Sequence, residues 1–267
     1  MNNPSSPQAA RTVLLEALSV LGAWRDAITV VGGWVPDLLC PDCGHMGSLD
    51  ADLALDTRKI APAAYDTIKE RLISAGYRPK AGLTHVFLRE VATPNGPQIF
   101  TIKLDLVTGK QADHTHVHGM NLSPLAGLEF AFESHFFMRL EGILPSGARD
   151  AVQAQVASAA AMVVMKAIAM DERLKPKDAY DLVFCLKHWE PGIADIAAQL
   201  RPHLKHPAVA RALGVLREKF ASIDHRGPQE AGPLIAAQEG VDVVMARQDA
   251  FGRVAELLRA VDQDANA

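Results

Sequence analysis

The first 110 residues alternate between apolar stretches with the spacing of helices and of strands. A helix is predicted from Ser6-Pro7 to about Gly22, because apolar residues recur there at helical spacing and proline is favoured at a first helical position. The other elements predicted in this half are a strand over 28–31, a short helix over 34–39, a strand over 50–55, a helix from Pro62 to Gly76, and a hairpin of strands 85–91 and 99–107.

After about residue 150 the pattern changes to alanine-rich segments with helical periodicity. Helices are predicted over 157–170, 177–188, 192–201, 206–221, 229–238 and 241–262. Pro124 to Gly147 shows neither period clearly, and we interpret it as short strands mixed with loop. We therefore expect an α+β chain of two domains: an α/β domain with a small mixed sheet over residues 1–150, and an all-helical domain over 151–267.

Composition narrows the class of protein further. Of the 267 residues, 49% are hydrophobic and 22% charged, which is typical of a folded globular chain. The net charge of −4 argues against a protein that coats nucleic acid by bulk charge. The longest uncharged apolar stretch, Val156–Met165, is far shorter than the ~20 residues of a membrane span, so no membrane partner is expected. Three cysteines and the absence of a signal-like start predict a cytoplasmic location.

Acidic residues in two predicted strands give the first chemical indication. Asp50 and Asp52 alternate with apolar residues, so both lie on one strand face, where two carboxylates repel each other unless a cation sits between them or one is protonated. Asp105 lies in the apolar stretch 102–107, where a lone charge is costly to bury. The three carboxylates predict a site for Mg²⁺ or Mn²⁺. The alternatives are an exposed polar face and, for Asp105, an ion pair with Lys103.

Two further features suit a phosphorylated substrate. Gly32-Gly33 stands between a strand and a helix, where backbone N–H groups can meet phosphate oxygens, although a simple tight turn explains it as well. Lys166 follows nine uncharged residues of a predicted buried helix and needs an anionic partner, either a triphosphate or Asp181. The alternative is a lysine at a helix end that reaches water.

Together these segments resemble a known family. The residues that carry the resemblance are Val30-Val31-Gly32-Gly33, Ser48-Leu49-Asp50-Ala51-Asp52, Leu104-Asp105, the helix 160–167, and the segment 173–182. The first three resemble the nucleotidyltransferase fold shared with DNA polymerase beta. The last two are similar to AbiEii-type nucleotidyltransferases, which include the toxins of AbiE and the MenT toxins. The resemblance covers about residues 28 to 188.

The resemblance implies a role for each matching residue. Asp50 and Asp52, with Asp105, would hold the catalytic metal, and Asp181 would orient Lys166 or the acceptor. Gly32, Gly33, Ser48 and Lys166 would bind the nucleotide. The implied reaction moves a nucleoside monophosphate from a nucleoside triphosphate to an acceptor, and the helical domain completes the active site. The implied partners are a nucleoside triphosphate, a tRNA 3′ end as acceptor, and a separately encoded antitoxin.

Three features stay outside this interpretation. The segment between Gly33 and Asp50 is longer than expected and contains Cys40, Cys43 and His45, which resemble half of a zinc ribbon, although an ordinary loop is the more economical reading. His114, His116 and His118 would share a strand face, either as metal ligands or as a polar surface. Residues 201–226 carry six Lys or Arg, which fits RNA phosphates or a solvated helix face.

Competing functions follow from these alternatives. A small-molecule nucleotidyltransferase of the kind that modifies aminoglycosides would use the same metal site with a more acidic approach. A catalytically silent member would bind nucleotide or RNA without transfer. A metalloprotein built on the three histidines would carry a transition metal.

Overall fold

A computed structural model describes residues 6–92, 98–110, 116–117 and 120–263. The chain divides into two compact units. The first contains the residues up to Val35 together with Gly47–Ala157, and the second contains Pro36–Met46 together with the residues from Ser158 onward. A short segment of the amino-terminal half therefore belongs to the carboxy-terminal unit.

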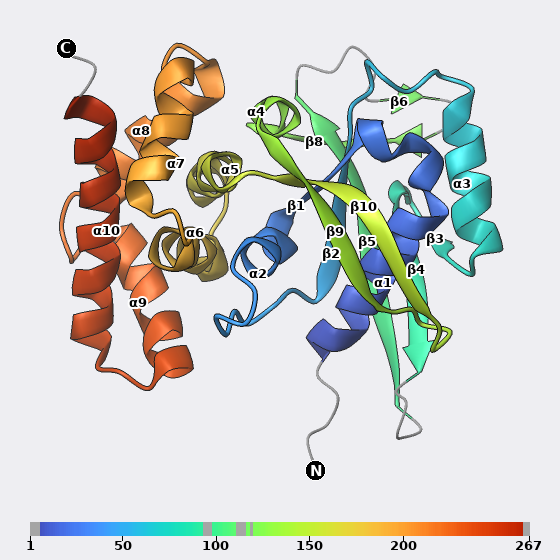
Figure 1. Ribbon diagram of the computed structural model, residues 1–267, viewed down its shortest axis with the longest axis horizontal. Helices are drawn as coiled ribbons and strands as arrows, with labels where there is room; N and C mark the ends of the chain where they lie inside the picture. Colours follow the sequence, from blue (N-terminus) through green and yellow to red (C-terminus); the bar gives the residue numbers. More distant parts are fainter. Residues whose placement is uncertain (1–5, 93–97, 111–115, 118–119, 264–267) are drawn as a thin grey trace. The chain divides into compact units, whose positions relative to one another are not determined.

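The first unit is built on a mixed sheet (Figure 1). Its strands follow the order β3-β4-β5-β2-β1-β10-β9, with β8 paired to β5. The bounds are β1 Ile28–Val31, β2 Asp50–Leu55, β3 Arg78–Lys80, β4 Leu83–Ala92, β5 Ile99–Gly109, β8 Ser123–Leu125, β9 His135–Ile143 and β10 Arg149–Ala157. The pairs β1–β10, β2–β5 and β5–β8 are parallel, and the others are antiparallel. The short strands β6 (His116–Val117) and β7 (Met120–Asn121) form a separate pair.

Helices cover this sheet with their apolar sides. Helix α1 (Ser6–Val20) contacts β2, β5 and β10, and its residues Val13, Leu14 and Leu18 are buried. Helices α3 (Ala64–Ser74) and α4 (Leu128–Glu133) complete the helices of this unit, with the 3₁₀ segments Gly22–Ala27 and Gly32–Trp34. The strand–glycine–helix order at β1 matches the sequence-based expectation, because α2 (Val35–Leu39) follows the glycine turn.

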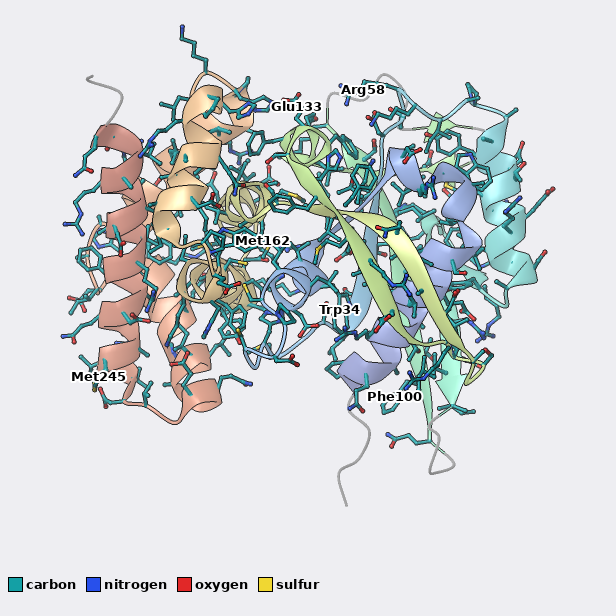
Figure 2. All side chains as sticks on the ribbon, in the orientation of Figure 1. Trp34, Arg58, Phe100, Glu133, Met162 and Met245 are labelled. Carbon is teal, nitrogen blue, oxygen red and sulfur yellow. The ribbon has the colours of Figure 1, made fainter. Side chains whose placement is uncertain are left out.

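The second unit is helical. It contains α5 (Ala159–Glu172), α6 (Pro176–His188), α7 (Ile193–Leu200), α8 (Pro207–Lys219), α9 (Arg226–Glu239) and α10 (Val243–Gln263), with the 3₁₀ turn Arg201–His203. Helix α5 is buried on nearly all sides and packs against α6, α7 and α8, which explains why it lacks an amphipathic pattern. Met162 of α5 is 1% exposed, whereas Met245 of α10 is 63% exposed (Figure 2).

The structure confirms the α+β class and corrects the region around residue 150. Residues 149–157 form β10, which pairs with β9 along its whole length, so the predicted domain boundary at 150/151 falls inside a strand. No element was predicted over 149–156, because alanine, which recurs along β10, does not favour strands. Pro124–Gly147 resolves into the end of β8, α4 and β9.

In the described part of the chain no helix is both long and apolar enough to cross a membrane. The tip of the hairpin between β4 and β5, predicted over 93–97, lies outside the described residues.

Candidate active site

Parallel pairing of β2 with β5 brings three carboxylates together. Asp50 lies opposite Lys103, and Asp52 lies opposite Asp105, so all four side chains emerge on one face of the sheet. Each of Asp50, Asp52 and Asp105 offers an oxygen atom, and these atoms lie within 4.8 Å of one another. All three residues are half-buried. Oxygen atoms this close together, from two separate strands, can bind one cation in common.

The glycine turn touches this cluster. β1 pairs with β2 so that Val31 lies opposite Asp52, and Gly32 follows with a φ of +75°. A Cβ atom at Gly32 would lie 2.1 Å from Oδ2 of Asp52, so a side chain here would displace the carboxylate. Gly33 is buried in the 3₁₀ turn that leads into α2. Glycine at position 32 thus lets the backbone approach the acidic cluster closely.

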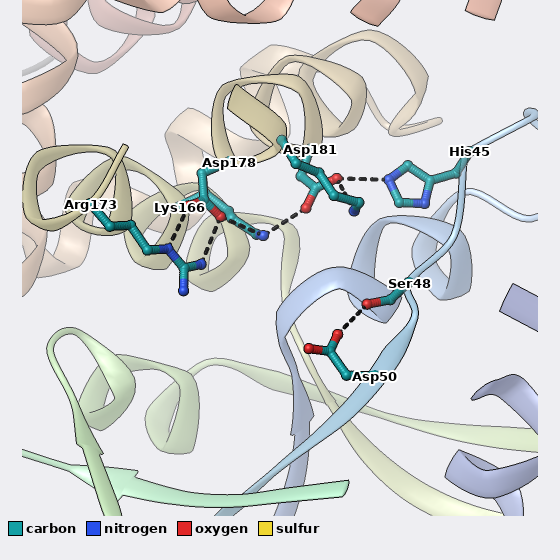
Figure 3. A network of polar contacts seen from close by, with 8 residues as sticks. His45, Ser48, Asp50, Lys166, Arg173, Asp178 and Asp181 are labelled. Atoms are coloured by element: carbon teal, nitrogen blue, oxygen red, sulfur yellow. Dashed lines mark hydrogen bonds and ion pairs between the residues drawn. The ribbon is translucent and has the colours of Figure 1, made fainter. Parts of the chain in front are cut away.

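Two contacts fix the orientation of Asp50. The Ser48 hydroxyl donates a hydrogen bond of 2.7 Å to Oδ1 of Asp50 (Figure 3). The indole Nε1 of Trp34 donates to the backbone oxygen of Asp50 at 2.9 Å. Ser48 and Trp34 are both buried, so they hold the start of β2 in a defined place.

Lys103 lies inside the acidic cluster. Its ammonium is 2.6 Å from Oδ2 of Asp105 and 3.4 Å from Oδ2 of Asp50. Burial opposes the charge of this lysine, but the hydrogen bond to Asp105 and the nearby carboxylates raise the pKa of Lys103 above its ordinary value. The ion pair with Asp105 that the sequence left open is therefore present, together with the carboxylate cluster rather than instead of it.

One oxygen in the cluster has no partner among the described residues. Oδ1 of Asp105 is buried and accepts no hydrogen bond there, which is an expensive arrangement for a carboxylate oxygen. The other potential metal ligands in the cluster are carboxylate oxygens of two further residues, Asp50 and Asp52. Hard oxygen donors of this kind suit Mg²⁺ or Mn²⁺ far better than a soft transition metal. The residues present therefore fit a divalent cation.

A second charged network lies within the helical unit, centred on Lys166 of α5 (Figure 3). The Lys166 ammonium donates to Oδ1 of Asp178 at 2.9 Å and to Oδ2 of Asp181 at 2.6 Å. Both aspartates are fully buried, and Lys166 is 6% exposed. Burial opposes the charge of Lys166, but Asp181 and Asp178 outweigh it and raise the pKa of Lys166. The anionic partner that the sequence required is thus supplied by α6.

Two more cations complete this network. Arg173 binds Asp178 through two hydrogen bonds of 2.7 and 2.9 Å, and Lys177 donates to Oδ1 of Asp181 at 2.7 Å. Burial would raise the pKa of Asp181, but Lys166, His45 and Lys177 hold it well below its usual range. The pKa of Asp178 is lowered in the same way by Arg173 and Lys166 against the effect of burial. Each buried carboxylate is therefore ionised and fully compensated.

His45 joins the network from the segment that precedes β2. Its Nε2 lies 2.9 Å from Oδ1 of Asp181, and its side chain has no exposed surface. The ring stacks on Tyr180 at 5.4 Å and meets the edge of Phe184 at 4.7 Å. The side chain of Gln238 also donates to the backbone oxygen of Gly44 at 2.9 Å. These contacts explain why Pro36–Met46 belongs to the helical unit.

The remaining metal hypotheses find little support in the described residues. Cys40, Cys43 and Cys185 are free thiols, and the acidic triad is the group of three metal-binding side chains that the described part of the chain contains. His45 is engaged with Asp181 instead of a cysteine pair. Of the histidine triplet, His114 and His118 lie outside the described residues, and only the backbone of His116 is described, in β6.

The basic stretch 201–226 is largely engaged within its own unit. Arg211 pairs with Asp171 and Glu172, Arg217 with Asp262, and Lys219 with Glu218. Arg226 pairs with Glu230, and Arg201 donates to the backbone oxygen of Ala260. Pairing of this kind favours the solvated-face interpretation over a basic surface held ready for RNA phosphates.

The sequence did not indicate the roles of Trp34 and His45. Trp34 reads as a helix start and gives no sign that its indole reaches back to Asp50. His45 was assigned to a loop with two cysteines, and nothing local links it to a residue 136 positions later. Lys177 was detectable, because it stands four residues before Asp181 on one helix.

An acidic cluster on a mixed sheet, in contact with a glycine turn and followed by a helical unit, suits an enzyme that uses a divalent cation. The comparison with known families specifies which one. The family described as "Nucleotidyl transferase AbiEii toxin, Type IV TA system" matches residues 47–256. The match spans well over half of the chain, so the chain belongs to this family and is a nucleotidyltransferase.

Solved structures add two similar proteins, both from Helicobacter pylori. One, described as a candidate nucleotidyltransferase, is 14% identical with a TM-score of 0.48, and the similarity covers 94% of this chain and 97% of that one. The other, JHP933, is 15% identical with a TM-score of 0.46, and 95% of each chain is covered. No curated protein matches the chain.

Proposed function

We propose that this protein transfers a nucleoside monophosphate from a nucleoside triphosphate to an RNA acceptor and releases pyrophosphate, in a reaction that depends on Mg²⁺ or Mn²⁺. The observation that carries the proposal is the convergence of Asp50, Asp52 and Asp105. In this cluster the buried Oδ1 atom of Asp105 accepts no hydrogen bond from the described residues. Three carboxylates whose oxygens lie within 4.8 Å of one another repel unless a cation lies among them or one is protonated, and Lys103 offsets only one of the three charges.

Asp50, Asp52 and Asp105 would hold the divalent cation. When bound, such a cation activates the attacking hydroxyl and stabilises the charge that develops on the phosphates. Ser48 supports this site by fixing the carboxylate of Asp50 through a 2.7 Å hydrogen bond. The Trp34 indole restrains the backbone of Asp50, so the strand presents its carboxylate without a search among rotamers.

The glycine turn and Ser48 would bind the triphosphate. Gly32 and Gly33 leave the backbone next to Asp52 free of side chains, so that a phosphate oxygen can approach main-chain N–H groups. Ser48 lies two residues before Asp50, and its single O–H donor would turn from Asp50 to a phosphate oxygen when the triphosphate binds.

We assign to Lys166 a phosphate-binding role and to Asp181 the role of positioning it. An ammonium carries three N–H donors, and two of those of Lys166 point at Asp178 and Asp181. The remaining donor supports a contact with one phosphate oxygen. Asp178 and Asp181 fix the ammonium so firmly that it loses little further entropy on binding.

Family membership supports the choice of acceptor and partner. The chain belongs to a family of type IV toxin-antitoxin toxins. We therefore propose a tRNA 3′ end as acceptor and a separately encoded antitoxin as the protein that restrains the activity.

Incubation with labelled nucleoside triphosphates tests the proposal directly. Wild-type protein, Asp52→Asn and the control Asp224→Asn, an exposed carboxylate of the helical unit, are each mixed with purified tRNA, with Mg²⁺, Mn²⁺ or EDTA. We expect label on the tRNA 3′ end with wild type and the control only when metal is present, and at least about a hundredfold less with Asp52→Asn.

Other outcomes would contradict parts of this proposal. Label on an added aminoglycoside but not on tRNA would replace the acceptor with a small molecule. Nucleotide binding without transfer to any acceptor would make the protein a catalytically silent member. Full activity in EDTA would remove the metal from the reaction.

A further inference from the structure

Lys103 lies among the carboxylates that would hold a metal ion. It lies opposite Asp50 in the parallel pairing of β2 with β5, two residues before Asp105 on the same strand face. Its ammonium is 2.6 Å from Oδ2 of Asp105 and 3.4 Å from Oδ2 of Asp50, so it bridges carboxylates of both strands. A divalent cation shared by these residues would need the same oxygen atoms.

Charge explains why the chain carries a lysine here. Three ionised carboxylates whose oxygens lie within 4.8 Å of one another have a formal charge of −3, and Lys103 reduces this to −2. The lysine side chain is 38% exposed, so its flexible stem can carry the ammonium into solvent when another cation arrives.

We propose that Lys103 is the built-in counter-ion of the metal site: it holds Asp50 and Asp105 together in the metal-free protein, and a divalent cation must displace it. This inference rests on the proposed function, because it assumes that the acidic cluster takes a metal. Lys103 is a positioning residue in this account. It keeps the carboxylates converged without metal, and it weakens the binding of free metal by competing for the same oxygens.

The contrast with Lys166 supports a mobile role for Lys103. Lys166 is 6% exposed and lies between two fully buried aspartates, which in turn bind other cations. Lys103 is several times more exposed, and Oδ1 of its partner Asp105 remains without a hydrogen bond among the described residues. In the first arrangement each carboxylate is already matched by cations, and the second is one that a further cation can complete.

The test uses the full chain and free Mn²⁺, without nucleotide. Lys103→Met removes the charge and keeps the length of the side chain, Lys103→Arg keeps the charge, and Lys69→Met makes the same change at an exposed position of α3. Calorimetric titration gives the Kd for Mn²⁺, and thermal unfolding in EDTA and in Mn²⁺ gives the stability with and without metal.

We expect Lys103→Met to bind Mn²⁺ about tenfold more tightly or better than wild type, because a positive charge a few ångströms from the metal is gone. In EDTA its Tm falls below that of wild type, and Mn²⁺ raises it by more than it raises the Tm of wild type. Lys103→Arg and Lys69→Met keep the wild-type Kd within about threefold. If Lys103→Met unfolds without metal, refolding on addition of Mn²⁺ gives the same answer.

Three results would decide otherwise. Equal Mn²⁺ affinity in wild type and Lys103→Met overturns the counter-ion role and leaves the proposed function intact. If Lys103→Arg also binds Mn²⁺ more tightly than wild type, the shape of the side chain rather than its charge controls metal binding, and the counter-ion role is overturned. If neither wild type nor Lys103→Met binds Mn²⁺, both this inference and the metal-dependent function fail.

Discussion

At the scale of single residues, the candidate site depends on atoms that nearly touch. The space at Gly32 is the clearest case, because the carboxylate of Asp52 occupies the volume that any side chain at position 32 would need. Ser48 and Trp34 act at the same scale on Asp50, the first by a hydrogen bond to its carboxylate and the second by a hydrogen bond to its backbone oxygen. A change of one methyl group at this place should therefore be felt in the chemistry.

Gly32→Ala is the prediction that follows. The φ of +75° and the 2.1 Å approach to Asp52 make the substitution costly, by at least about 1 kcal/mol in the free energy of unfolding. Asp52 must move, so Mn²⁺ binding and nucleotidyl transfer should both be lost. Urea denaturation and metal titration measure the two effects.

Gly214→Ala is the matched control. Position 214 lies inside α8 with open space around it, and alanine favours helix, so this variant should be as stable as wild type or up to about 1 kcal/mol more stable. If Gly32→Ala behaves like this control, the close contact with Asp52 does not exist in solution.

At the scale of elements, pairs of segments create what no single segment has. Strands β2 and β5 each carry ordinary-looking acidic residues, and only their parallel register makes a cluster. Helices α5 and α6 do the same for Lys166, Asp178 and Asp181. The second pair is a closed network of ionised groups inside the helical unit, where the loss of one member leaves others buried without compensation.

Lys166→Met and Lys177→Met separate the central cation of this network from a peripheral one. Lys166 compensates two fully buried aspartates, so its loss should lower the free energy of unfolding by about 3 kcal/mol or more. Lys177 pairs with Asp181, which Lys166 also compensates, and is itself penalised by burial, so its loss should cost about 1 kcal/mol or less. Urea denaturation compares them.

The same two variants bear on function. If Lys166 contacts phosphate, the KM for nucleoside triphosphate should rise in Lys166→Met, measured at a temperature where the variant is folded, and should stay near wild type in Lys177→Met. Equal stability losses in both variants would mean that Lys166 does not hold the network together.

At the scale of the whole molecule, the chain passes between its two units more than once. Pro36–Met46 leaves the sheet unit, contributes buried Leu38, Leu39 and Cys40 as well as His45 to the helical unit, and returns before Ser48. The carboxy-terminal helices are therefore incomplete without a piece of the amino-terminal half.

A fragment of residues 158–263 tests this dependence. Without His45 and its neighbours, the fragment exposes Tyr180 and Phe184. Adding a synthetic peptide of residues 34–47 should therefore raise the Tm of the fragment by several degrees, since 1 kcal/mol in the free energy of unfolding shifts the Tm by about 4–8 °C in a domain of this size. The same peptide with His45→Ala is the control and should raise the Tm of the fragment by less. If neither peptide changes the Tm of the fragment, the helices fold stably without the segment Pro36–Met46.

Features of the fold and site that depend on residues close together in the sequence could be predicted, and those that depend on distant residues could not. The helices after residue 158 and the strand of Asp50 and Asp52 were evident, because burial of one face imposes a period on neighbouring residues. Strand β10 was not predicted, since its alanines do not favour strands and only pairing with β9 along its length makes it one. Asp105 was found by the cost of burying a charge, although nothing local said which strand it would pair with.

The sequence by itself determined which residues would carry charge into an apolar setting and which face of each element they would share, since both depend on neighbours a few positions apart. Only the tertiary structure decided that Lys103 faces Asp50, that Gly32 abuts Asp52 and that His45 reaches Asp181. Those contacts join residues far apart in the chain, and they form because burying many apolar groups at once fixes strand order and helix packing, which no single stretch of sequence encodes.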